Sequence, residues 1–202
     1  MKTNFKAASQ FVQMKRGHNE ESLSGPGSWK KNAAISRDFI NEIIPKYSIK
    51  SILDLGCGDW NWFEDVNLQG ASYEGWDADD QMIKSNQSQY GSETVNFLTS
   101  DIFTQEYPPV DLVICRDVLF HVDPELALWL IEQCKRKSKF FLSTSFKNNQ
   151  SKGKPVPYCD IKDWGYYTVN LNIEPFNLGP YEIESRHEKD FGRDICLYNF
   201  TA

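Results

Sequence analysis

The residues whose types and spacing most clearly indicate chemistry are Asp54-Leu55-Gly56-Cys57-Gly58. They follow the short apolar run 51–53, which predicts a strand inside a parallel sheet. Gly56 and Gly58 can adopt positive φ and have no Cβ, so a ligand can approach the backbone closely. A buried strand that ends in this way predicts a loop for a nucleotide-type cofactor.

The spacing of this loop argues against a dinucleotide. A dinucleotide loop reads Gly-x-Gly-x-x-Gly, and its third glycine lets the following helix direct its N-terminus at a pyrophosphate. The residue three past Gly58 is Asn61, and Asp59 follows Gly58 directly. Because the Asp59 carboxylate would repel a pair of phosphates, NAD is a poor fit and an oxidoreductase is disfavoured.

Two further acids follow the next two predicted strands. Asp77 ends the run 71–77 and lies 19 residues past Gly58, close to the offset of about 20 at which an acid meets ribose hydroxyls in a βαβ unit. An ionised carboxylate can accept from both hydroxyls, although a solvated acid at a strand end is the alternative. Asp101 follows a third strand at 95–98, and Asp79 or Asp80 is expected to cap the intervening helix.

The segment from Asp54 resembles motif I of the class I S-adenosylmethionine (SAM) methyltransferases, Asp-x-Gly-x-Gly-x-Gly, with Trp60 in place of the third glycine. SAM carries a sulfonium and an ammonium but no phosphate, so an acid-flanked loop suits it. The resemblance implies that Asp77 binds the ribose, that Asp101 faces the adenine amino group and that Ile102 offers its backbone amide. The cofactor contacts implied by the resemblance come from Asp54, Gly56, Gly58, Asp77, Ala78, Asp101 and Ile102.

The wider pattern resembles a largely bacterial family of small class I methyltransferases. The matching stretches are Ser24-Gly25-Pro26-Gly27-Ser28, residues 57–62, residues 115–121, Asn170-Leu171 and Pro175-Phe176. The resemblance implies that Arg37 binds the SAM carboxylate and that Trp60 covers the methionyl chain, where an indole could make a cation–π contact with the sulfonium. Core packing is the alternative for both Trp60 and Trp62.

The catalytic candidates follow the fourth predicted strand, at 110–115, because ligands in open α/β sheets bind beyond the carboxyl ends of the strands. If a helical turn follows, Asp117 and His121 are i and i+4 neighbours on one face. A carboxylate that holds an imidazole is a reasonable general base for an attacking hydroxyl. The alternative is that Asp117 caps the turn and His121 packs beneath it. Arg116 is predicted either to contact the cofactor or another anionic group, or to pair with Asp117.

The acceptor is expected to be a small molecule or a glycan, methylated at oxygen. This strand end has neither the Asn/Asp-Pro-Pro-aromatic motif of adenine amino methyltransferases nor the Pro-Cys nucleophile of cytosine C5 enzymes. Trp62, Tyr158 and Trp164 have amphipathic rings suited to a sugar or an aromatic metabolite, with simple packing as the alternative. Methylation at nitrogen, and a non-catalytic SAM-binding module that acts through a partner, also remain open.

The elements that must position these residues alternate as in a doubly wound α/β fold. The prediction is a Rossmann-like, seven-stranded sheet, mainly parallel, with an antiparallel C-terminal hairpin at 181–186 and 194–200. Helices are expected at 29–45 and from Asp123-Pro124-Glu125 to residue 137. Residues 1–28 are expected to form a short helix and a Gly-Pro-Gly loop that close over the cofactor as a lid, and residues 29–202 the SAM-binding domain.

Composition fits a compact enzyme of 202 residues, 14 % of them aromatic. The net charge of −6 disfavours nucleic acid as a partner. No apolar run has the length of a membrane span, and the N-terminus has no signal-peptide core. The five cysteines form no Cys-x-x-Cys pair, which predicts buried reduced thiols, a cytoplasmic location and no metal site. The oligomeric state stays open.

Overall fold

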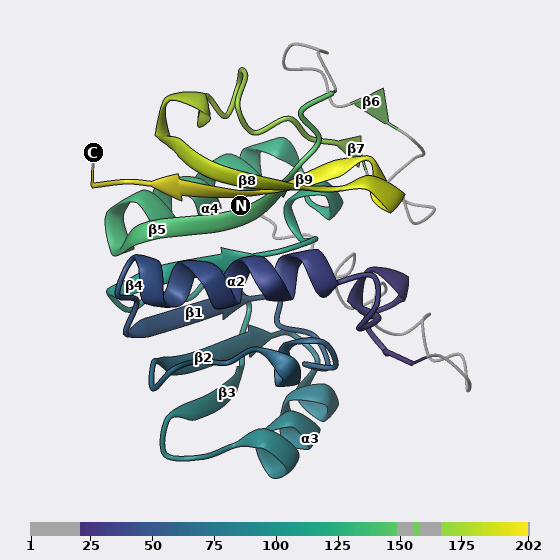
Figure 1. Ribbon diagram of the computed structural model, residues 1–202, viewed down its shortest axis with the longest axis vertical. Coiled ribbons are helices and arrows are strands. Elements are labelled where there is room, and N and C mark those ends of the chain that lie inside the picture. The colour runs from purple at the N-terminus through teal and green to yellow at the C-terminus, as the bar shows by residue number, and fades with distance from the viewer. Residues whose placement is uncertain (1–20, 149–155, 158–166, 202) are drawn as a thin grey trace. The chain divides into compact units, whose positions relative to one another are not determined.

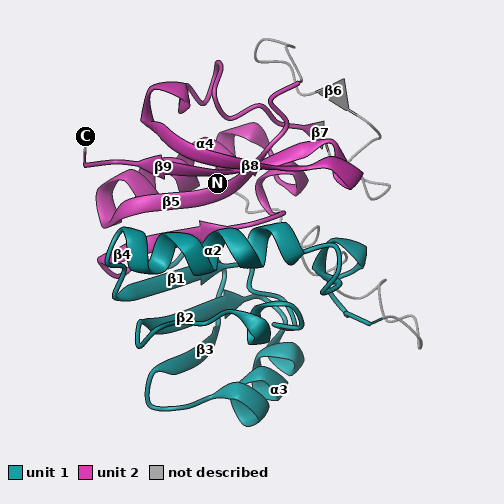
Figure 2. Cartoon of the chain, in the orientation of Figure 1, with its two compact units in different colours: residues 1–105 teal, residues 106–202 magenta. Residues whose placement is uncertain are grey.

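A computed structural model describes residues 21–148, 156–157 and 167–201 (Figure 1). Within it the chain divides into two compact units, Met1–Gln105 and Glu106–Ala202 (Figure 2). The helix predicted at residues 1–17, Tyr158, Trp164 and Cys159 lie outside the described residues. The division expected at residue 28 therefore stays a prediction.

The first unit contains three parallel strands in the order β3-β2-β1. They are β1 (Ser51–Leu55), β2 (Ser72–Asp77) and β3 (Val95–Thr99). Four of the five residues of β1 are buried, as the apolar run predicted. Leu55 pairs with Trp76, so the loop after β1 and the end of β2 meet at the same edge of the sheet.

The helices of the first unit are η1 (Pro26–Ser28), α2 (Ala34–Lys46), η2 (Phe63–Asp65) and α3 (Asp80–Tyr90). The expected helix start at residue 29 was wrong by five residues. Residues 29–33 form turns instead, and Asn32 Nδ2 donates to Pro26 O at 2.8 Å, which ties this stretch back to the Gly-Pro-Gly loop. Asp79 caps α3 by accepting from the amides of Gln81 and Met82.

The second unit contributes β4 (Val110–Cys115), β5 (Ser138–Ser145), β9 (Arg193–Asn199) and β8 (Glu182–Glu188), in the order β4-β5-β9-β8. β4 and β5 are parallel, whereas β9 runs antiparallel to both β5 and β8. The hairpin turns through η6 (Lys189–Phe191) and Gly192 at φ 61°. The predicted seven-stranded, mainly parallel sheet with an antiparallel C-terminal hairpin is confirmed.

The remaining elements of the second unit are η3 (Leu119–His121), α4 (Pro124–Lys137) and η5 (Gly179–Tyr181). α4 starts with Asp123 at the cap position and a proline in its first turn, and it ends on three cations, as predicted. A separate pair of two-residue strands, β6 (Val156–Pro157) and β7 (Tyr167–Thr168), was not predicted. Two residues are too few to show alternation in a sequence.

The described cysteines are free and buried, at positions 57, 115, 134 and 196. Burial raises the pKa of the Cys57 and Cys134 thiols well above the ordinary value, and that of Cys196 to about 12. These thiols are therefore protonated and unreactive at neutral pH. They serve as small core residues, in agreement with the sequence.

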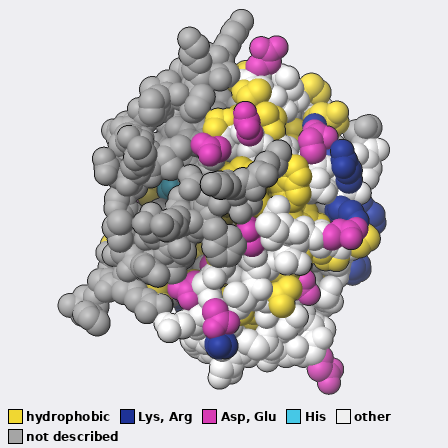
Figure 3. Space-filling model, turned by 180° about the vertical axis from the view of Figure 1, so that it is seen from behind, with side chains coloured by type: hydrophobic (Ala, Val, Ile, Leu, Met, Phe, Trp, Pro, Cys, Tyr) yellow, Lys and Arg dark blue, Asp and Glu magenta, His cyan; other side chains and the backbone are white. Residues whose placement is uncertain are grey.

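Charged side chains are unevenly distributed on the face shown in Figure 3. Over its described part, Asp and Glu are scattered among uncharged residues, while Lys and Arg gather mainly near one edge. In the described part of the chain, no helix combines the length and the apolar character of a membrane span.

Candidate active site

The loop after β1 is fastened to the end of β2 by its own backbone. The amides of Gly56 and Cys57 donate to Trp76 O at 2.8 and 3.1 Å, and Gly58 N donates to Asp77 Oδ2 at 3.1 Å. Gly56 and Gly58 have φ values of 79° and 60°, in the left-handed region that glycine adopts without strain. The structure thus brings together the glycine loop and the acid that the sequence singled out.

Asp77 is held ready to accept further hydrogen bonds. Its Oδ2 accepts from Gly58 N, and its Oδ1 accepts from Asp79 N at 3.0 Å. A carboxylate has about four lone-pair sites, so each oxygen keeps capacity for another donor. Burial raises the pKa of Asp77 above its ordinary value, the backbone amides of Asp79, Gly58 and Ala78 oppose this rise, and the charge of Asp79 adds to it.

Asp59 joins the loop to the segment that precedes α2. Its carboxylate accepts from Ser22 Oγ at 3.0 Å, Leu23 N at 2.6 Å and Ser24 Oγ at 3.2 Å. Its own amide donates to Ser24 Oγ at 3.0 Å. We refer to these contacts of residues 22–24 with Asp59 as the Asp59 latch. Sequence reasoning missed the latch, although the two serines before the Gly-Pro-Gly loop offered donors for an acid.

The latch makes Gly58 sterically necessary, which predicts a measurable effect of Gly58→Ala. A Cβ at Gly58 would lie 2.2 Å from Ser24 Oγ, and the residue has φ +60°. Left-handed strain costs an alanine about 1–2 kcal/mol, and displacement of Ser24 adds to this. We expect Gly58→Ala to lower the free energy of unfolding by about 2–4 kcal/mol in urea denaturation.

Gly70→Ala is the matched control for this substitution. Gly70 has φ +81° with nothing within 4 Å of a new Cβ, so it shares the backbone strain and lacks the clash. It should lose only about 1–2 kcal/mol. Equal losses in the two variants would show that Ser24 does not constrain the loop.

Trp60 keeps the backbone of the glycine that it replaces. Its φ is 58°, and its side chain is 7 % exposed. The indole packs in a cluster whose ring centroids lie 4.8–5.7 Å away, those of Phe63, Tyr73, Tyr90 and Phe97. Trp62 is equally buried and packs edge-on against Phe63 at 5.1 Å. These positions favour the packing interpretation of both tryptophans, which the sequence had left open.

The other predicted cofactor residues of the first unit have varied surroundings. Asp54 is 4 % exposed and accepts from Tyr73 Oη at 2.7 Å, so this hydrogen bond links β1 to β2 inside the protein. Asp101 accepts from Phe103 N at 3.0 Å, which caps the turn beyond β3. Ile102 is buried, and Ala78 directly follows Asp77 in the chain. The Arg37 guanidinium forms an ion pair with Asp38 at 2.8 Å.

In the second unit, the predicted catalytic carboxylate belongs to a buried four-residue ion network. Asp117 Oδ2 lies 3.0 Å from Arg116 Nη1 and 2.8 Å from Arg193 Nη2. Glu188 lies 3.3 Å from Arg116 Nη2 and 2.7 Å from Arg193 Nε. Arg116, Glu188 and Arg193 are 7, 2 and 5 % exposed. The pairing of Arg116 with Asp117 was one of the two predicted roles, whereas Glu188 and Arg193 were not foreseen.

The expected helical relation between Asp117 and His121 was wrong. Asp117 has φ 61°, and the 3-10 helix η3 begins only at Leu119, so Asp117 lies outside the turn that carries His121. Asp117 N and Oδ1 instead hydrogen-bond to Thr144 Oγ1 at 3.1 and 2.8 Å. The left-handed backbone and these bonds direct the carboxylate toward β5 and the arginines.

The surroundings of Asp117 keep its carboxyl group ionised. Burial by itself would raise the pKa of Asp117, yet the charges of Arg116 and Arg193, the Thr144 hydroxyl and His121 together hold it below its ordinary value. Asp117 is therefore ionised at neutral pH and is a weak proton acceptor.

Comparison with known proteins agrees with this fold. Residues 53–142 match the family model Methyltransf_11, described as a methyltransferase domain. The ubiquinone biosynthesis O-methyltransferase of Nitrosomonas europaea is 32 % identical over an alignment of 127 residues, and the match covers 56 % of this chain and 52 % of that protein. The chain thus spans about half the length of this curated relative.

Solved structures of methyltransferases share the fold over nearly the whole chain. The N-methyltransferase NodS from Bradyrhizobium japonicum WM9, in complex with S-adenosyl-L-homocysteine (SAH), has a TM-score of 0.69 at 10 % identity, covering 96 % of this chain and 97 % of its own. Magnesium protoporphyrin IX methyltransferase (ChlM) from Synechocystis PCC 6803, with bound SAH, has a TM-score of 0.61 at 15 % identity, covering 98 and 95 %. The fold is that of the class I SAM-dependent methyltransferases.

Proposed function

We propose that this protein is a SAM-dependent methyltransferase that acts on a small-molecule or glycan acceptor at oxygen. The observation that carries the proposal is the glycine loop fastened to Asp77 at one edge of a methyltransferase-type sheet. The match to a methyltransferase domain over residues 53–142 and the SAH-bound relatives of the same fold support it. The buried free thiols suit a reducing compartment, so we place the protein in the cytoplasm.

The residues at the ends of β1, β2 and β3 fit the polar groups of SAM. Asp77 would accept from the two ribose hydroxyls with its remaining lone pairs. Ser100 donates its amide to Asp77 O and precedes Asp101. Its buried Oγ has no hydrogen-bond partner among the described residues, so it could bond to a ligand. Asp101 and Ile102 would bind the adenine edge, and Arg37 the carboxylate.

The raised pKa of Asp77 predicts pH-dependent cofactor affinity. Ribose hydroxyls donate to the ionised carboxylate, and burial makes this carboxylate easier to protonate than usual. Affinity for SAH should therefore fall as the pH drops from 7 through the pKa of Asp77, which is raised above its ordinary value. Calorimetric titrations between pH 4.5 and 7.5 would measure this, with Asp77→Asn as the control that removes the dependence. An unchanged slope in Asp77→Asn would assign the titration to another group.

The chain's own residues would prepare the acceptor. SAM supplies a methyl group on a sulfonium, and the protein aligns the acceptor oxygen for in-line attack. His121 would take the proton of the attacking hydroxyl, while the ionised Asp117 stabilises the imidazolium that forms. Arg116 and Arg193 would then position Asp117. A hydroxyl needs such a base more than an amine does, which favours oxygen, as does the name of the curated relative.

Replacing His121 separates an enzyme from a binding module. We expect His121→Asn to lower kcat by about 100- to 10,000-fold, the usual contribution of a general base, with unchanged affinity for SAH. The assay is transfer of labelled methyl from SAM to a panel of phenols, catechols and sugars. His187→Asn is the control, because His187 is exposed and paired with Asp194 at 3.2 Å. Full activity of His121→Asn would remove the base role, and tight SAH binding without turnover on any acceptor would favour the binding module.

The acceptor site and the lid remain proposals. Trp62 is buried against Phe63, so only its edge could meet an acceptor, and Tyr158 and Trp164 lie outside the described residues. Of the proposed lid, the Asp59 latch fastens residues 22–24 to the cofactor loop. If residues 1–28 move over SAM, they would therefore either pivot about the Asp59 latch or break its hydrogen bonds.

A further inference from the structure

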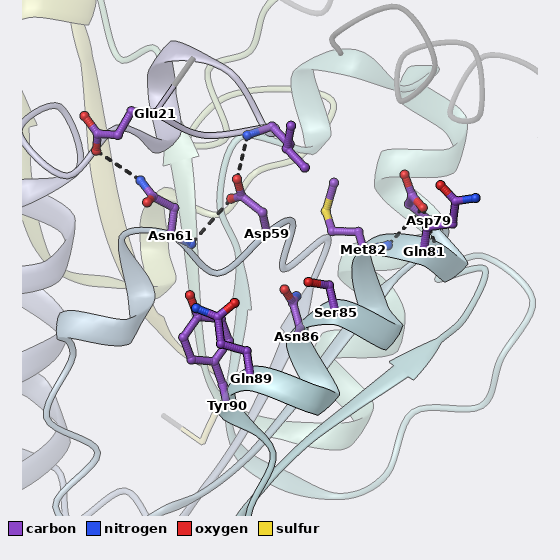
Figure 4. A pocket seen from close by; sticks show the side chains of 11 residues that line it. Glu21, Asp59, Asn61, Asp79, Gln81, Met82, Ser85, Asn86, Gln89 and Tyr90 are labelled. Atoms are coloured by element: carbon purple, nitrogen blue, oxygen red, sulfur yellow. Dashed lines mark hydrogen bonds between the residues drawn. The ribbon is translucent and has the colours of Figure 1, made fainter. Parts of the chain in front are cut away.

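A pocket of 370 Å³ lies in the first unit between residues 21–23, the loop after β1 and α3 (Figure 4). This volume is within the range of small-molecule sites, about 300–1,000 Å³. Asp77 does not belong to its lining. The pocket therefore does not include the carboxylate that we assign to the ribose of SAM.

The polar wall of the pocket is rich in acceptors. Glu21, Asp59 and Asp79 contribute carboxylates, and no Lys or Arg belongs to the described lining. Asp59 is already engaged by the latch, and Glu21 Oε1 accepts from Asn61 Nδ2 and Lys30 N. The charge of Asp59 nevertheless reaches the pocket: burial, Glu64 and Asp59 raise the pKa of Tyr90, and only Lys30 opposes this rise. A cation is favoured in such a field.

Asn86 gives an independent indication of a ligand. Its side chain is 3 % exposed, and its Nδ2 donates to Gly58 O at 2.8 Å. Because that carbonyl can only accept, the orientation of the amide is fixed, and Oδ1 faces the pocket. Among the described residues, no group donates to this oxygen. A ligand in the pocket that brings an N–H or O–H group could therefore donate to this oxygen.

The remaining wall suits a short carbon chain. Leu23, Met82 and the ring of Tyr90 border the pocket, and the Tyr90 ring packs against Trp60 at 4.8 Å. Side chains of this kind bury alkyl groups and attract cations to an aromatic face. The pocket is thus lined by hydrogen-bond acceptors (Glu21, Asp59, Asp79 and Asn86) and by the apolar surface of Leu23, Met82 and Tyr90.

We propose that this pocket is a second ligand site, which binds a small organic cation through a primary ammonium group. An ammonium carries three donors and no acceptor, matching Asn86 Oδ1 and the carboxylates, while its carbon chain would lie on Leu23, Met82 and Tyr90. The bound cation bridges α3 and residues 21–23, and it stabilises the Asp59 latch beside the cofactor loop.

The probe is n-butylammonium, compared with 1-butanol of equal length and no charge. In NMR titrations at pH 7.5, the amine should shift the side-chain amide signals of Asn86 and Gln89 saturably, and the alcohol should not. Saturating SAH should leave the amine affinity within about twofold, because the two sites are separate. Equal shifts by both probes, no shift of Asn86, or displacement of the amine by SAH would each overturn the proposal.

Two surface substitutions test the charge of the pocket without disturbing the core. Glu21→Gln should weaken amine binding by about two- to fivefold, and Gln89→Glu should strengthen it by a similar factor, as expected for exposed charges. Glu132→Gln, on the exposed side of α4 and paired with Lys135, is the matched control and should change nothing. Identical affinities in all three variants would place the amine elsewhere.

Discussion

Asp77→Ala is expected to raise the Kd for SAH at least 100-fold, which removes detectable binding in a calorimetric titration. Asp77 is the acid at the end of β2 that offers lone pairs to both ribose hydroxyls. Hydrogen bonds to a charged group contribute about 1.5–3 kcal/mol each, so the loss of two amounts to about 3–6 kcal/mol. Each 1.4 kcal/mol is tenfold in Kd, which gives the expected factor.

Two controls separate this ligand effect from a loss of loop structure. Asp77 also accepts from Gly58 N and Asp79 N, so the variant will lose some stability by itself. Asp77→Asn keeps the shape and one acceptor, and it should bind SAH with intermediate affinity. It should lose less stability than Asp77→Ala loses, although its amide nitrogen would face one of the two backbone N–H groups. Asp80→Ala removes an exposed acid of the neighbouring helix, paired with Lys84, and should bind normally. Wild-type affinity in Asp77→Ala would contradict the assignment of the ribose site.

Glu188→Gln is expected to lower the free energy of unfolding by about 3–5 kcal/mol. Glu188 is 2 % exposed and neutralises two arginines that are themselves buried, Arg116 at 3.3 Å and Arg193 at 2.7 Å. Removing one partner of a buried ion pair leaves the other charge uncompensated, which costs about this much. The two guanidiniums would then share only Asp117. Urea denaturation monitored by tryptophan fluorescence gives the value.

A matched substitution on the same strand serves as the control for Glu188→Gln. Glu184 pairs with Arg186 at 3.6 Å, and the arginine side chain is 39 % exposed. The Glu184 side chain is 16 % exposed, so the pair is partly open to solvent and Glu184→Gln should cost about 1 kcal/mol. Because Glu188 and Asp117 share both arginines, Glu188→Gln should also alter the pH profile of turnover, whereas Glu184→Gln should not. Equal stability losses would mean that the buried network contributes no more than a surface pair.

The sequence predicted the meeting of the glycine loop with Asp77 because its signals are local. An apolar run, two spaced glycines and an acid lie within a few residues, and parallel strands carry such ends to one edge of a sheet. The spacing from Gly58 to Asp77 then predicted that the two would meet, and the structure joins them at 3.1 Å. Strand positions followed from the same local patterns.

Features that depend on distant residues could not be predicted in this way. Arg116 and Glu188 are 72 residues apart, and Ser22 and Asp59 are 37 apart. No periodicity links such partners, because their approach results from the sheet order and the packing around it. Asp117 was likewise misplaced on a helical turn, since a left-handed φ in a non-glycine residue has no sequence signature and here depends on Thr144 and the arginines.

Titration of the intact protein with SAM, SAH and NAD tests the central proposal most directly. We predict micromolar binding of SAM and SAH in a calorimeter and no heat from NAD, because Asp59 follows the glycine loop where a pyrophosphate would need positive or neutral surroundings. Binding of SAH at this level would justify the acceptor screen. Binding of NAD, or the absence of any binding of SAM and SAH, would contradict the assignment of the glycine loop and Asp77 as a SAM site.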